Sequence, residues 1–183
     1  RLLKILVAGA SAGLAVSMFF VKTSVISLLV PLAMFSFLYS IATRFKLRSV
    51  AWLMKVPGTK TIILALVWAA ATVFIPVLQA QIPISEGRVL LVFIQRLIFI
   101  FAIAIPFDIR DMDADSRAGI KSIPASFGTK KALLICNLAI IFSVLPALLQ
   151  YYYFGVNFIF PASLLSQSII LFMVNNRKIQ RLP

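Results

Sequence analysis

Four of the five acidic residues of this chain lie within eight positions, in the run Asp108-Ile-Arg-Asp111-Met-Asp113-Ala-Asp115. On one helix Asp108, Asp111 and Asp115 are spaced i, i+3 and i+7 and share a face, while Asp113 points elsewhere. Like charges at this spacing repel one another, so a cation is their natural partner. Carboxylates without a nearby His or Cys suit Mg²⁺, which takes one or two of them and leaves its other positions to water or substrate phosphate.

The same carboxylates also fit a purely structural interpretation. They can belong to a solvated loop in which Arg110 and Arg117 are their ion-pair partners. The pattern alone leaves both interpretations open.

The composition indicates a membrane protein. Of 183 residues, 62% are hydrophobic and 13% are charged, which is more apolar surface than a soluble domain of this size can bury. The absence of His excludes the commonest general base and metal ligand. The single cysteine, Cys136, lies in an apolar run and is expected to be a buried structural thiol. Because the chain starts at Arg1 without a signal-peptide pattern, we expect a fragment or a processed chain.

Apolar runs long enough to cross about 30 Å of hydrocarbon predict an all-α, polytopic transmembrane helix bundle. We expect residues 1–183 to form a single membrane domain. Its six predicted spans are approximately 2–21, 24–42, 61–80, 89–107, 132–153 and 157–174.

The distribution of Lys and Arg predicts the orientation of the bundle. With six spans, alternate connections lie on the same side, and one side receives fifteen of the eighteen basic residues. That side holds the start of the chain, the basic loop 43–60, the acidic loop 108–131 and the tail. We therefore expect both loops on the cytoplasmic face of a cytoplasmic membrane.

An acidic loop and a basic loop at one end of an apolar bundle suit one type of ligand. The carboxylates can hold Mg²⁺, the cationic loop can neutralise phosphate oxygens, and the bundle can accept a hydrocarbon tail. A diphosphate with an isoprenoid tail has all three properties, and the metal and basic residues then stabilise the departing diphosphate.

The stretch from Asp111 through Gly119, Lys121 and Ser122 to Gly128 resembles the second aspartate-rich motif of the UbiA superfamily of intramembrane prenyltransferases. In that motif a DxxxD is followed by a Gly, a Lys and a TxP or SxP turn. The segment from Tyr39 to Arg44 is similar to the tyrosine-led basic motif of the family. The six spans resemble helices three to eight of a family member.

The resemblance implies a bundle of UbiA type and a role for each matching residue. Asp111 and Asp115 would bind Mg²⁺ that bridges to the prenyl diphosphate, with Asp108 one turn earlier as a possible helper. Lys121 would contact the diphosphate. Tyr39, Arg44 and Lys46 would bind the substrate at the basic loop. The implied partners are a prenyl diphosphate, a lipophilic acceptor such as an aromatic ring, and membrane lipid, with no nucleic acid.

The sequence departs from the family pattern at two places. The first aspartate motif, NDxxDxxxD, is absent from this sequence, and no second acidic cluster replaces it. The basic motif has Ser40 where Pro is usual and Thr43 where Lys is usual.

Arg96 lies inside a predicted span, where a charge is costly and functional by default. The alternative is that it extends toward the far interface or pairs with Gln95 and Glu86. Three functions follow from the sequence. The first is a Mg²⁺-dependent prenyltransferase, the second a non-catalytic UbiA-like protein that binds prenyl lipids, and the third a small transporter, supported only by Arg96 and the prolines within the spans.

Overall fold

The computed structural model describes residues 22–45, 56–155 and 159–175, together with Val7, residues 9–13 and Val16; for residues 35–36, 38–45 and 159–160 it describes only the backbone. Every regular element in these ranges is a helix, so the all-α prediction is confirmed. The helices are α2 (Thr23–Phe45), α4 (Thr59–Gln79), α5 (Gly87–Arg110), α6 (Met112–Ala118), α7 (Ile123–Phe127), α8 (Thr129–Phe142), α9 (Val144–Phe154) and α10 (Ile159–Asn175).

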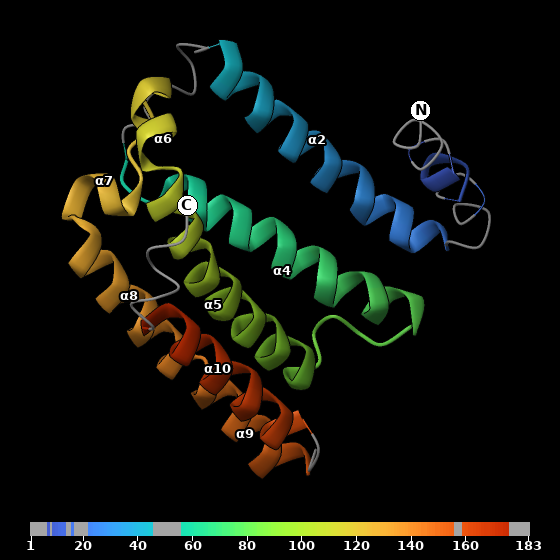
Figure 1. Cartoon of the computed structure of the whole chain (residues 1–183). Helices are drawn as coiled ribbons and strands as arrows, with labels where there is room; N and C mark the ends of the chain where they lie inside the picture. The colour runs from blue at the N-terminus through green and yellow to red at the C-terminus, as the bar shows by residue number, and fades with distance from the viewer. Residues whose placement is uncertain are drawn as a thin grey trace.

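The long helices lie side by side. α4 packs between α2 and α5, while α8 and α9 pack along the other side of α5, and α10 lies against α9 (Figure 1). The connection 80–86 reverses the chain, so the first turn of α4 lies at the end of the bundle where α5 finishes. The short helices α6 and α7 lie at this same end (Figure 1).

Small buried residues hold α4 against its neighbours. Thr61, Ala65, Ala69 and Val73 recur every four residues and are all buried, which lets helix backbones approach closely. A second cluster joins α5, α7 and α8 and includes the buried Cys136, whose thiol donates to the carbonyl of Ala102. The two clusters fix the end of α5 relative to α4 and α7.

α8 and α9 follow one another directly and form one apolar segment, Thr129–Phe154. Ser143 between them keeps right-handed helical torsions (φ −68°, ψ −14°), and its hydroxyl donates to the carbonyl of Ile140 at 2.7 Å. Three segments of the described chain are long and apolar enough to cross a membrane, namely Thr59–Gln79, Gly87–Arg110 and Thr129–Phe154.

These three segments coincide with the predicted spans 61–80, 89–107 and 132–153. The predicted spans 24–42 and 157–174 fall on α2 and α10, where shorter apolar helices are found. The predicted span 2–21 lies almost entirely outside the described residues. The number of spans and the single domain 1–183 stay predictions.

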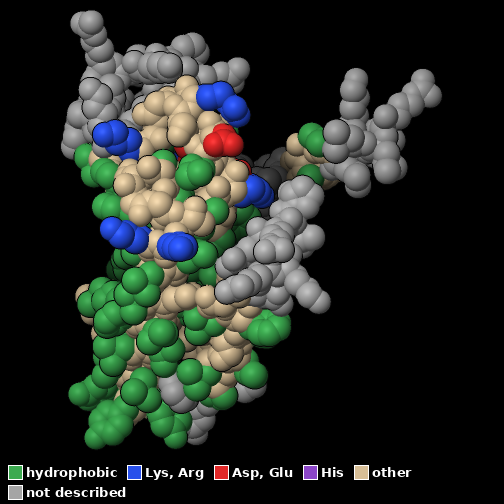
Figure 2. Space-filling model, turned by 60° about the vertical axis from the view of Figure 1, so that its left-hand side comes forward, with side chains coloured by type: hydrophobic (Ala, Val, Ile, Leu, Met, Phe, Trp, Pro, Cys, Tyr) green, Lys and Arg blue, Asp and Glu red, His purple; other side chains and the backbone are tan. Residues whose placement is uncertain are grey.

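Charged and apolar side chains occupy different parts of the surface along the bundle. Figure 2 shows basic and acidic side chains gathered toward one end of the visible face, whereas apolar side chains cover the rest. Large exposed apolar residues occur on all the long helices, as expected of a lipid-facing surface.

Candidate functional site

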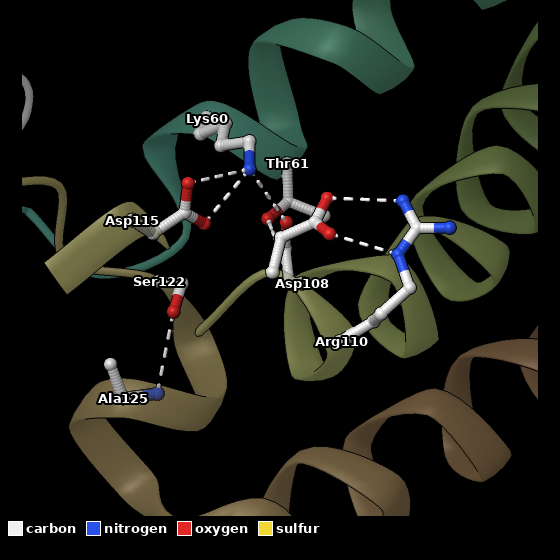
Figure 3. A network of polar contacts seen from close by, with 8 residues as sticks. Lys60, Thr61, Asp108, Arg110, Asp115, Ser122 and Ala125 are labelled. Carbon is white, nitrogen blue, oxygen red and sulfur yellow. Dashed lines mark hydrogen bonds and ion pairs between the residues drawn. The ribbon is translucent and has the colours of Figure 1, made fainter. Parts of the chain in front are cut away.

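A network of ionic contacts joins α4, α5 and α6 at the charged end of the bundle. The ammonium Nζ of Lys60 lies 2.9 and 2.8 Å from the two carboxylate oxygens of Asp115 and 3.4 Å from Oδ1 of Asp108 (Figure 3). Both carboxylates are buried, with side-chain exposed fractions of 5% for Asp108 and 8% for Asp115. Two buried negative charges therefore converge on one cation position.

Thr61, the residue after Lys60, fixes the orientation of Asp108. Its hydroxyl donates a short hydrogen bond to Oδ2 of Asp108, and the Thr61 side chain is buried. Because Lys60 contacts the other oxygen, both oxygens of Asp108 have a partner from the first turn of α4.

The helix carrying the carboxylates is interrupted at Asp111. This residue lies between α5 and α6, as the C-cap of the first and the N-cap of the second, with φ −91° and ψ 6°. Asp favours the ends of helices over their interiors, and Asp113 and Asp115 lie in the first turn of α6, where the helix dipole stabilises negative charge. The backbone N–H groups of Asp111 and Asp115 still donate to the carbonyls four residues earlier, at Phe107 and Asp111. That the three carboxylates share one face stays a prediction.

The Asp111 side chain pairs with its neighbour on the surface. The guanidinium of Arg110 donates to its two carboxylate oxygens at 2.9 and 3.2 Å. This hydrogen bond lowers the pKa of Asp111. The interpretation as an Arg-paired surface loop thus describes Asp111, whereas Asp108 and Asp115 are buried and contact Lys60. Among the residues that the structure describes, no three acidic, His or Cys side chains are placed to hold a metal ion together.

The loop after α6 docks on the start of α4. The backbone N–H of Gly58 donates to the carbonyl of Lys121 at 3.2 Å, and Gly58 adopts φ +81°, a conformation that favours glycine. A Cβ at Gly58 would lie 2.9 Å from Cγ1 of Ile123, so a larger residue here would force the Ile123 side chain to move. Ser122 caps α7 by accepting from the N–H of Ala125, which agrees with the expected SxP turn at Ser122 and Pro124.

The structure describes the remaining predicted site residues only in part. Lys121 lies in the loop beside Gly58, and its side chain is exposed. Tyr39 and Arg44 lie in the last turns of α2, where only the backbone is described. Lys46 lies outside the described residues. Whether these three approach the carboxylates stays a prediction.

An apolar groove runs along the bundle from the charged end. It has a volume of about 730 Å³ and lies among α4, α5, α8 and α9. Its walls on α5 are Leu91, Ile94, Leu97, Ile98 and Phe101, and on α4 they include Ile62, the residue after Thr61. The groove therefore begins within one or two helical turns of the ionic network.

A model of the UbiA prenyltransferase family matches residues 1–181. The chain belongs to the UbiA prenyltransferase family. No curated protein and no solved structure matches it. Members of the UbiA family are prenyltransferases built as helical membrane bundles, so the resemblance and the fold class predicted from the sequence are confirmed.

Two residues of this UbiA chain that contact the carboxylates were not predicted as site residues. The sequence pattern places Lys60 only at the end of the basic loop 43–60, and Thr61 only at the start of the predicted span 61–80. Their partners lie 47 to 55 positions away, so spacing along one helix could not reveal them. The available signal was a lysine at the border of an apolar span, where a charge needs a partner or the interface.

Proposed function

We propose that this UbiA chain is a Mg²⁺-dependent membrane prenyltransferase that moves an isoprenyl group from a prenyl diphosphate to a lipophilic acceptor. The observation that carries the proposal is the convergence of two buried carboxylates, Asp108 and Asp115, on one cation position at the charged end of the bundle. Family membership supports the class of reaction.

The donor set around Lys60 suits Mg²⁺. Asp108 and Asp115 supply two carboxylates, and Mg²⁺ typically takes one or two while substrate phosphate completes its coordination. Asp111 lies between them in sequence and can add a third carboxylate when it leaves Arg110. When bound, the metal would neutralise the charge that develops on the departing diphosphate.

The other residues of the network would orient a carboxylate or neutralise the charge of the diphosphate. Thr61 holds Asp108 by its hydrogen bond, so this carboxylate needs little reorganisation. The Lys60 ammonium is partly exposed, and once displaced from the carboxylates it can pair with a phosphate oxygen. Lys121 extends from the neighbouring loop toward solvent and supplies a further positive charge. Tyr39, Arg44 and Lys46 join the substrate site on the basis of the family resemblance.

The apolar groove would take the isoprenoid tail. Its walls carry almost no polar surface, and it begins beside Thr61 at the charged end. A diphosphate at the carboxylates and a tail in the groove can therefore belong to one substrate. The basic loops favour a site that opens to the cytoplasmic side of the membrane.

The test is Mg²⁺-dependent consumption of a labelled prenyl diphosphate by the purified chain. Asp108→Asn and Asp115→Asn are each expected to lower the rate by about 100-fold or more, because each removes a negative charge from the cation position. Asp113→Asn is the matched control, since Asp113 lies on the same segment with an exposed side chain, and it should keep the parent rate. Parent-like turnover by the Asp115→Asn protein would remove the assignment.

The second candidate is a non-catalytic protein that binds prenyl lipids. It is favoured by the ion pair that already neutralises Asp108 and Asp115 and by the pairing of Asp111 with Arg110. Under this function the parent chain binds prenyl diphosphate, and the label remains on the intact diphosphate with or without Mg²⁺. Equilibrium binding and turnover on one preparation separate the two candidates.

A further inference from the structure

A second cavity lies between α5, α9 and α10 and differs in chemistry from the apolar groove. Its volume is about 370 Å³. Six polar side chains line it, namely Gln95, Arg96, Gln150, Ser163, Ser166 and Gln167. Arg96 precedes Asp108 by twelve residues on α5, about 18 Å along the helix axis at 1.5 Å per residue. One diphosphate cannot span both sites.

Arg96 supplies an available positive charge to this cavity. Its side chain is exposed, and it has no acidic partner among the described residues. Glu86 is the acid expected to pair with Arg96, but its Oε1 instead lies 3.7 Å from Nε of Arg88. A guanidinium inside an apolar span is costly unless a counter-charge or the interface compensates it. The cavity therefore contains a cation suited to an anionic ligand.

The side-chain oxygen of Gln167 is a buried hydrogen-bond acceptor that has no donor among the described residues. Its side chain is 3% exposed, and Oε1 has no hydrogen-bond partner in the described part of the chain. By contrast Gln150 donates to Oε1 of Gln95 at 2.9 Å and to the carbonyl of Pro146 at 3.2 Å. An orphaned amide oxygen beside a cavity indicates a ligand with an O–H or N–H group.

We propose that this cavity binds the headgroup of one anionic phospholipid that carries a free hydroxyl, such as a phosphoglycerol headgroup. The phosphate pairs with Arg96, whose fork of donors matches two phosphate oxygens, and the hydroxyl donates to Oε1 of Gln167.

The size and depth of the cavity agree with this ligand. Its volume equals roughly a dozen water volumes, enough for a headgroup and too little for an acyl chain as well. Arg96 lies about 10 Å of helix rise inside the apolar segment that starts at Val89, and its long side chain can reach toward the headgroup level. The acyl chains then lie along the apolar outer surface of the bundle.

Native mass spectrometry of the purified chain with added lipids tests the proposal. For the parent, phosphatidylglycerol is expected to bind at least about tenfold more tightly than phosphatidylcholine, with one molecule retained per chain. Phosphatidylmethanol, which has the charge but no hydroxyl, should bind with intermediate affinity. Equal affinity for all three lipids would overturn the proposal.

Three variants assign the two contacts. Arg96→Gln should abolish the preference for anionic lipid, and it removes a charge from an apolar span, so folding is not expected to suffer. Gln167→Leu should make phosphatidylglycerol and phosphatidylmethanol equal while both remain above phosphatidylcholine. Arg88→Gln, on the same helix, is the matched control and should change nothing. A preference that survives Arg96→Gln or disappears with Arg88→Gln would overturn the assignment.

Competition with soluble glycerol phosphate distinguishes a site for a lipid from a site for a free phosphate compound. For a lipid site it should not displace phosphatidylglycerol at millimolar concentration. Competition that Arg96→Gln abolishes would show that the cavity takes the free phosphate, which contradicts the lipid proposal.

Discussion

Lys60 occupies the position between two buried carboxylates that a metal ion would take in the function we propose. Asp108 and Asp115 are close enough to share one ammonium, so without a cation they would repel each other in a poorly solvated place. An organic cation that is partly exposed can leave more readily than one that is sealed in. Lys60 can therefore keep the site folded in the absence of metal and yield to metal with substrate.

Replacement of this ammonium tests the exchange. We expect Lys60→Met to lower the stability of the chain in detergent by about 2 kcal/mol, between the values typical of exposed and of buried ion pairs. Mg²⁺ should then raise the thermal midpoint of Lys60→Met more than that of the parent, because no ammonium competes for the carboxylates. Lys130→Met, an exposed lysine of α8, is the control. An equal response to Mg²⁺ in all three proteins would contradict the exchange.

The hydroxyl of Thr61 can be removed with almost no change in shape. Thr61→Val leaves an oxygen of Asp108 buried without its donor, which should cost about 1–3 kcal/mol in thermal unfolding. Thr72→Val in the same helix removes a hydroxyl from an exposed position that donates only within its own helix, to the carbonyls of Trp68 at 2.7 Å and Ala69 at 3.4 Å. This control should change stability by less than about 0.5 kcal/mol. Equal losses would mean that the bond to Asp108 has no special value.

At the level of residues, the acidic residues of the site are easier to predict from the sequence than the cation that they contact. The cluster itself was visible because charges are rare in this chain. The contact of Lys60 with Asp115 joins residues 55 positions apart. Lys60 lies on α4 and Asp115 on α6, so their contact depends on how the helices pack at this end of the bundle. Side-chain pairs between helices depend on rotation and axial offset, which local periodicity does not specify.

The docking of the segment before α4 on the loop before α7 positions the ionic network. Gly58 adopts φ +81° and lies so close to Ile123 that a Cβ would be 2.9 Å from Cγ1. Lys60 follows two residues later, so a shift of this turn moves the ammonium directly.

Gly58→Ala is therefore expected to weaken the site by two additive effects. The left-handed backbone costs about 1–2 kcal/mol for a residue with a Cβ, and the contact with Ile123 adds to it. Gly155→Ala is the matched control, because Gly155 has φ +62° and a Cβ there would meet no described residue within 4 Å. Gly58→Ala should lose more stability than Gly155→Ala and also lose turnover. Equal stability losses would show that the close contact is unimportant.

The helices themselves were well predicted from apolar runs, but the interruption at Asp111 was not. A period of 3.6 residues extended across Asp108, Asp111 and Asp115 assumes an unbroken helix. The backbone leaves that conformation at Asp111, and this residue turns to Arg110 while the other two carboxylates meet Lys60. Helical periodicity and propensity do not reveal which partner each of these carboxylates meets.

At the scale of the whole molecule, the reversal of α4 on α5 places two connections at opposite ends of the bundle. The connection 80–86 lies at one end, whereas α6 and α7 lie at the other, beside the first turn of α4 (Figure 1). The described basic residues Lys60, Arg110, Arg117, Lys121, Lys130 and Lys131 lie in or next to the segments at the end of the bundle that holds α6 and α7. Together with the count over the whole sequence, this predicts that this side faces the cytoplasm.

Single cysteines at the two ends test this orientation. Ser116→Cys in α6 and Ser85→Cys in the connection 80–86 both replace exposed side chains. In sealed vesicles with the cytoplasmic face inward, a membrane-impermeant thiol reagent should label Ser85→Cys and leave Ser116→Cys unlabelled until the vesicles are opened. The parent, whose only cysteine is the buried Cys136, is the control and should stay unlabelled in both states. The reverse pattern would place the carboxylates on the outer face, where cytoplasmic prenyl diphosphate could not reach them, and would contradict both the orientation and the proposed substrate access.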